Sequence, residues 1–169
     1  PMALAQQGAV TRWHANAQSL VASFTGRGNA AQAYTMALIQ VAVYDATVAV
    51  RGMASNGKRL YKPFIADIVA PIGADLNAAI ATAAFRVGYE RVNSNETARA
   101  RYRSAYDAYL AAIPDGQAKT DGVAVGGEGG RGFHGVTVQG APFYHIGFRL
   151  AAQRAAGLLG HLGHDLLAD

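Results

Sequence analysis

The chain has 169 residues, a length typical of one domain, and 51% of them are hydrophobic whereas only 15% are charged. This balance excludes a disordered tail, because such segments bury too little apolar surface to fold. Fifteen Lys and Arg against eleven Asp and Glu give a net charge of +4, but the basic residues are scattered, which argues against a nucleic-acid-binding protein. The absence of Cys excludes disulfides, thiolate zinc sites and thiol nucleophiles.

Residues 1–7 contain Ala3-Leu4-Ala5, which has the small-x-small shape of a signal-peptidase site. We interpret this segment either as the remnant of a signal peptide or as an initiator with a cloning scar. The first interpretation predicts a periplasmic or secreted protein, and the second a cytoplasmic one. The longest uncharged stretch in the apolar half of the chain, Gly28–Tyr44, is shorter than the roughly 20 apolar residues of a membrane-spanning helix, so we expect no membrane span.

Two helices are predicted before residue 52. The first covers Val10–Phe24, and the second covers Asn29–Val50, which is apolar on almost every side and therefore typical of a buried helix. Asn29 is a natural N-cap for the second helix. Residues 52–73 are expected to form a connection, because two prolines interrupt them.

Two more helices follow the connection. The third begins near Asp75, and its apolar residues recur at helical spacing. The fourth begins with Asn93 and Glu96, whose spacing matches a capping box, and it ends at the turn Pro114-Asp115-Gly116. One face of this helix carries an apolar stripe and the other is expected to be solvated; the stripe is Tyr102, Tyr106, Tyr109 and Ile113, and the solvated residues are Arg99, Arg101, Arg103 and Asp107.

Glycines dominate the remainder of the chain. Because each glycine costs a helix about 1 kcal/mol relative to alanine, residues 126–144 are predicted to be a Gly-rich loop. Residues 145–169 carry Leu158, Leu162 and Leu166 at every fourth position, which predicts an amphipathic terminal helix. The whole chain, 1–169, is therefore expected to be a single all-α domain, a bundle of four or five helices with the Gly-rich loop before its last helix.

Three segments and the link between them resemble a known family. They are Val10–Ala17, Met36–Ala46 and Tyr109–Gly116, with Tyr61-Lys62-Pro63-Phe64 as the link. In this order they resemble the N-terminal helical half of bacterial vanadium-dependent haloperoxidase-like proteins, which belong to the type 2 phosphatidic-acid-phosphatase superfamily. The resemblance covers residues 8–126. It implies an all-helical bundle that is often exported.

The catalytic half of that family has no counterpart in this sequence. The family binds vanadate or phosphate with a Lys, an Arg followed by Pro, a Ser-Gly-His segment, and an Arg with a downstream His. This chain contains no Arg-Pro pair and no Ser-Gly-His. We therefore expect a truncated or naturally short relative that does not bind vanadate by itself and lacks haloperoxidase activity.

A second hypothesis is a small metal-dependent hydrolase of a phosphoester, ester or lactone. His161 and His164 share one face of the predicted terminal helix at a spacing compatible with a single divalent metal ion. Asp165 next to them is a candidate third ligand. Histidines near a Gly-rich helix end are also common without any such role.

Asp45 is the candidate for acid–base chemistry, because it lies on the buried face of the second helix. A buried carboxylate has to be paired, hydrogen-bonded or protonated. A general acid or base is one interpretation, and a structural tie to an Arg, to His14 or to a helix N-terminus is the other.

A third hypothesis is a non-catalytic binding or assembly module, for which the sequence names no small-molecule ligand. Half of a helical bundle leaves apolar surface uncovered, and large apolar patches favour association. We therefore predict a homo-oligomer.

Overall fold

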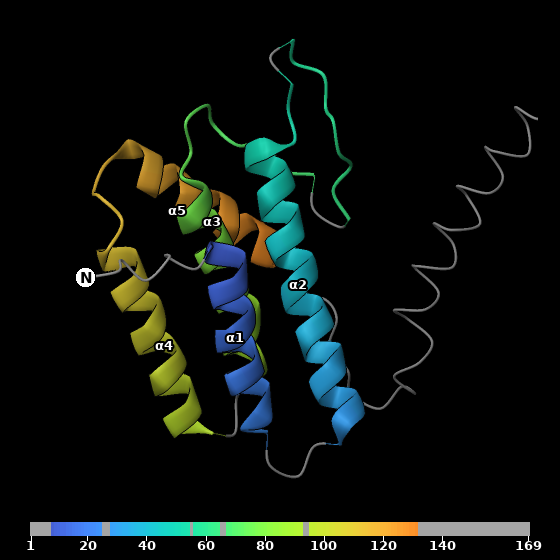
Figure 1. Ribbon diagram of the computed structural model, residues 1–169, viewed down its shortest axis with the longest axis vertical. Helices are drawn as coiled ribbons and strands as arrows, with labels where there is room; N and C mark the ends of the chain where they lie inside the picture. The colour runs from blue at the N-terminus through green and yellow to red at the C-terminus, as the bar shows by residue number, and fades with distance from the viewer. Residues whose placement is uncertain (1–7, 25–27, 55, 65–66, 93–94, 132–169) are drawn as a thin grey trace, which may run out of the picture. The chain divides into compact units, whose positions relative to one another are not determined.

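Five helices make up the part of the chain that the computed structural model describes, residues 8–24, 28–54, 56–64, 67–92 and 95–131. They are α1 (Ala9–Ala22), α2 (Asn29–Arg51), α3 (Leu76–Arg91), α4 (Glu96–Ala111) and α5 (Gln117–Arg131) (Figure 1). These described residues contain no β-strand, only one isolated bridge between Met53 and Arg59. The all-α helical bundle predicted from the sequence is therefore confirmed.

Helix α3 is the centre of the bundle, because it contacts each of the other four helices. Every residue from Ala78 to Ala84 is buried, and five of these seven residues are alanine. Small side chains on all sides of a helix let its neighbours approach closely from several directions. The alanine-rich sequence of α3 thus allows four other helices to pack closely against it.

An aromatic cluster fills the space between α1, α3 and α4. The indole of Trp13 is completely buried and makes edge-to-face contacts with Tyr102, Tyr106 and Tyr109, at centroid distances of 5.7, 6.1 and 5.7 Å. The phenol of Tyr102 donates a hydrogen bond of 3.0 Å to the carbonyl oxygen of Ala84 on α3. The predicted tyrosine stripe of the fourth helix therefore faces the core.

Side-chain caps fix the starts of α3 and α4. Asp75 accepts a hydrogen bond from the Ala78 N–H at 2.7 Å, and Asn95 accepts one from the Ala98 N–H at 3.0 Å. The predicted cap of the fourth helix was wrong in position, because Asn95 and not Asn93 is its N-cap. The predicted cap of the second helix was also wrong, because α2 begins after Gly28 and has no side-chain cap hydrogen bond.

The predicted loop over residues 126–144 is wrong at its beginning, because α5 continues to Arg131. Three glycines of α5, Gly122, Gly126 and Gly130, lie against α3 at a distance that leaves no room for a side chain. A Cβ atom on Gly126 would collide with the carbonyl oxygen of Ala79 and lie 2.7 Å from the Cβ of Thr82. Close packing against α3 thus outweighs the low helix propensity of glycine.

The remaining boundary predictions concern residues that the structure does not describe. Residues 1–7, the rest of the predicted loop (132–144) and the predicted terminal helix (145–169) lie outside the described residues. The five helices belong to one compact unit.

Helix α2 is the longest described helix and the most apolar. It has 23 residues and a hydropathy high enough to cross a membrane, and 44% of its apolar window is buried within the bundle. Core helices of soluble proteins and signal sequences share this property. The expectation that the chain has no membrane span stays a prediction.

Candidate functional site

The metal ligands predicted from the sequence, His161, His164 and Asp165, lie outside the described residues. Within the described ranges, no group of three or more His, Asp or Glu side chains is arranged to bind a metal ion. The metal-dependent hydrolase therefore stays a prediction, and the described helices add nothing to it.

The histidine of α1 contacts α2 through a side-chain pair. The Nδ1 atom of His14 lies 3.1 Å from the Nε2 atom of Gln40, at an exposed position. Asp45 is further along α2 and is completely buried, so this pair does not include it. The tie between Asp45 and His14 that the sequence suggested stays a prediction.

Asp45 fixes the connection between α2 and α3. Its Oδ1 atom accepts a hydrogen bond from the backbone N–H of Phe64, 2.5 Å away. On the next residue of the helix, the phenol of Tyr44 donates a hydrogen bond of 3.1 Å to the carbonyl oxygen of Lys62. Two consecutive side chains of α2 therefore attach the Lys62–Phe64 backbone to the helix.

The first half of the connection is an ordered turn. Met53 and Arg59 form an antiparallel bridge, and the Leu60 N–H donates to the carbonyl oxygen of Gly52 at 2.6 Å. Gly57 occupies the tip with a φ of 78°, a conformation that glycine adopts without strain. An ion pair of 2.6 Å between Arg59 and Asp67 joins the two halves of the connection.

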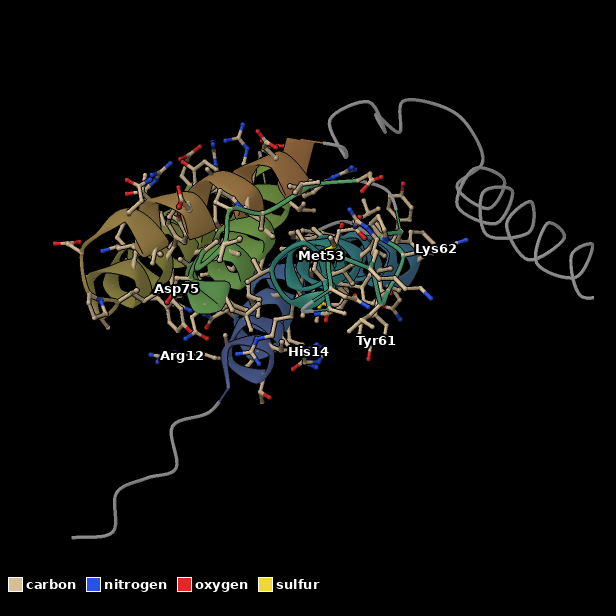
Figure 2. The ribbon with its side chains drawn as sticks, turned by 90° about the horizontal axis from the view of Figure 1, so that it is seen from above. Arg12, His14, Met53, Tyr61, Lys62 and Asp75 are labelled. Carbon is tan, nitrogen blue, oxygen red and sulfur yellow. The ribbon has the colours of Figure 1, made fainter. Side chains whose placement is uncertain are left out.

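Apolar side chains protrude from the described residues of the connection. Six of its large hydrophobic residues are exposed, with the exposed fraction rising from 41% at Phe64 to 74% at Val69 and 106% at Ile72. Together with the exposed Lys58 and Lys62 they form what we call the connection surface; its apolar members are Met53, Leu60, Tyr61, Phe64, Val69 and Ile72. The connection extends beyond the end of α2 (Figure 1), and the side chains of Tyr61 and Lys62 point outward (Figure 2).

A second group of charged and aromatic side chains lies between α3 and α4. The guanidinium carbons of Arg99 and Arg103 lie 4.4 and 4.6 Å from the centre of the Tyr89 ring. A hydrogen bond from Arg103 and the two positive charges lower the pKa of Tyr89 from its ordinary value. Arg99 was predicted to be solvated, but it is half-buried because it packs against this ring.

A shallow pocket between α1 and α4 offers little chemistry. Its polar lining includes Asn16, Ser19, Ser23 and Arg101, without a histidine or a carboxylate. The hydroxyl of Ser23 already donates to the carbonyl oxygen of Leu20 at 2.6 Å. The pocket therefore lacks the base that would activate a serine.

Comparison with known proteins gives no match. No family model matches the chain, and no curated protein or solved structure is significantly similar to it. The resemblance to haloperoxidase-like proteins stays a prediction, and function has to be argued from the residues of this chain.

Proposed function

We propose that the five helices form a non-catalytic binding module that docks through the connection surface. The observation that supports this proposal most is the exposure of six large apolar side chains on a segment that hydrogen bonds fix to α2. These hydrogen bonds hold the backbone of Lys62 and Phe64 in place, so little backbone entropy is lost there when a partner covers the neighbouring side chains. Groups of exposed apolar side chains commonly mark interaction sites.

The reactive side chains of the described helices support the same proposal. Asp45 is buried and accepts a hydrogen bond from the connection backbone, and the tyrosines of α4 pack around Trp13. A general acid or base needs access to a reacting group, and a carboxylate with no exposed surface has none. Asp45 therefore acts through the position of the connection.

The resemblance to the helical half of haloperoxidase-like proteins is compatible with a binding module. Oxyanion chemistry requires several positive donors around one anion, and the Arg-Pro and Ser-Gly-His segments that supply them in that family are missing from this sequence. We therefore expect no vanadate-dependent bromide oxidation by the purified chain. Calorimetric titration of the purified chain with vanadate measures whether the anion binds, and tight binding would overturn the proposal.

A fluorescent apolar dye tests whether the connection surface is available in the full chain. We expect the dye to bind the native chain, and the double variant Leu60→Ser with Ile72→Ser to lose at least half of the signal while keeping its circular dichroism spectrum. Val10→Ser is the matched control, since Val10 is 46% exposed on α1. Absence of dye binding, or an equal loss in the control, would contradict the proposal.

The predicted homo-oligomer is a separate question. Light scattering during size-exclusion chromatography measures the mass in solution. If the chain is a dimer that the Leu60→Ser and Ile72→Ser double variant dissociates, a second copy is the occupant of the connection surface.

A further inference from the structure

The segment that carries the connection surface, together with Arg51 at the end of α2, is basic. Residues 51–73 include four basic residues and one acidic residue, a net charge of +3 within a chain of +4. Arg59 pairs with Asp67, the acidic residue of this segment, at 2.6 Å. Arg51, Lys58 and Lys62 remain exposed, and none of them forms an ion pair with a described residue. Three exposed cations therefore accompany the exposed apolar side chains, and a negatively charged partner fits them.

The form of the surface also restricts the partner. Its apolar residues are spread over the turn after α2 and the irregular segment that leads to α3 (Figure 1), so they protrude as separate tips. Separate tips suit a partner that is soft and continuous, because each tip can enter it independently. Tyrosine beside lysine is also typical of the interface between lipid and water, where the ring stays in the headgroup layer and the ammonium reaches phosphate.

A second copy of the chain fits this surface less well. A twofold symmetric dimer would place the same patch opposite itself, and a charge of +3 would then face another +3. Like charges across an interface are unfavourable. The apolar residues alone would suit a second copy of the chain and a negatively charged partner equally well. The positive charge of the connection surface favours the negatively charged partner.

We propose that the connection surface binds the surface of an anionic lipid bilayer. Tyr61, Phe64, Val69 and Ile72 enter the headgroup layer, and Arg51, Lys58 and Lys62 contact lipid phosphates. This inference rests on the proposed docking function and names its partner. Exposed charges near an anionic membrane contribute about 1 kcal/mol each, so three of them provide a substantial part of the binding.

Co-sedimentation of the full chain with vesicles tests the charge requirement. We expect binding to phosphatidylcholine vesicles that contain 30% phosphatidylglycerol, much weaker binding to phosphatidylcholine alone, and release at high salt. Lys58→Gln and Lys62→Gln should each weaken binding roughly fivefold. Arg101→Gln is the matched control, because Arg101 is exposed on α4, which does not contact α2. Equal binding to neutral vesicles, or an equal effect of the control, would overturn the proposal.

A tryptophan reporter tests insertion of the tips. The native Trp13 is completely buried, so its emission should not respond to vesicles. In Tyr61→Trp we expect the added indole to shift to shorter wavelength on anionic vesicles and to be quenched by brominated lipids. Ile72→Ser in the same background should reduce both responses. An unchanged spectrum in the presence of bound vesicles would contradict insertion and overturn the proposal.

The vesicle and dye experiments fail in different ways. If the dye binds but anionic vesicles do not, the lipid proposal is wrong and the docking function stands, with a protein or a second copy as the partner. If neither binds, both proposals are wrong.

Discussion

The buried carboxylate of Asp45 and the backbone N–H of Phe64 form a hydrogen bond of 2.5 Å that joins α2 to the connection. The two residues are 19 positions apart in the chain. Asp45 has no exposed surface, so this contact forms away from water, where a donor without an acceptor costs about 1–3 kcal/mol. One side chain of the core therefore contributes directly to the position of the connection backbone at Phe64.

Replacing Asp45 should destabilise the protein in a graded way. Asp45→Ala removes the acceptor, and we expect the free energy of unfolding to fall by about 1–3 kcal/mol. Asp45→Asn retains an acceptor oxygen of similar size and should lose less than half of that amount. Urea denaturation followed by circular dichroism measures both variants.

The control for this series is Asp107→Ala, because Asp107 is an exposed residue of α4. Its effect should stay within about 0.5 kcal/mol, as for most surface substitutions. If Asp45→Ala were as stable as Asp107→Ala, the hydrogen bond to Phe64 would not contribute to the fold.

Two neighbouring glycines of α5 should respond to alanine with opposite signs. A Cβ on Gly126 would collide with α3, so we expect Gly126→Ala to lower the free energy of unfolding by about 1–3 kcal/mol despite better helix propensity. A Cβ on Gly127 meets no atom within 4 Å, so Gly127→Ala should raise stability by roughly 0.5–1 kcal/mol. Thermal and urea unfolding compare them directly, and effects of the same sign would argue against close packing of α5 on α3.

The same glycines show which parts of the fold follow from the sequence. Apolar residues predicted the first four helices, through helical spacing or, for the second helix, through an apolar sequence on almost every side, and this information is local. Helix α5 was not predicted, because its stability comes from α3, whose alanines leave space for a glycine face at residues 122, 126 and 130. Local helix propensity contains no term for a neighbour about 45 residues earlier in the chain.

The candidate site was less predictable than the fold. The sequence identified Asp45 as buried, but the hydrogen bond that it accepts from Phe64 comes from a backbone amide of the connection, and no side-chain pattern predicts such a donor. The connection surface was missed because a segment containing Leu60, Val69 and Ile72 resembles part of a core until its exposure is known. The predicted metal ligands His161, His164 and Asp165 lie outside the described residues.

The environment of Tyr89 predicts a measurable change in its ionisation. Because Arg103 lowers the pKa of Tyr89 by a hydrogen bond and by its charge, Arg103→Gln should return that pKa toward about 10. Absorbance of the phenolate during alkaline titration reports this, and Tyr89→Phe identifies which transition belongs to Tyr89 among the eight tyrosines. Arg101→Gln, on the same helix but without a ring contact to Tyr89 in the described structure, is the control. A transition that does not move in Arg103→Gln would contradict the contact.

Tyr102 predicts how stability depends on alkaline pH. Burial raises the pKa of Tyr102 in the folded state above its ordinary value of about 10, which applies to the unfolded chain. Below about pH 10 both states keep the proton, and the stabilising contribution of the buried phenol is fully present. Above pH 10 the unfolded chain releases the proton and the folded chain retains it, so stability is lost as pH rises, at about 1.4 kcal/mol per pH unit for this group.

Tyr102→Phe separates this pH dependence from the packing of the ring. At neutral pH the variant should lose about 1 kcal/mol, because the hydrogen bond of the phenol to the Ala84 carbonyl is removed. Above pH 10 it should lose stability less steeply than the native chain, so the difference between the two proteins shrinks as pH rises. Urea denaturation at pH 8 and pH 11 measures both effects, with the exposed Tyr61→Phe as control. Parallel losses in the native chain and in Tyr102→Phe would show that this phenol does not set the alkaline limit of the fold.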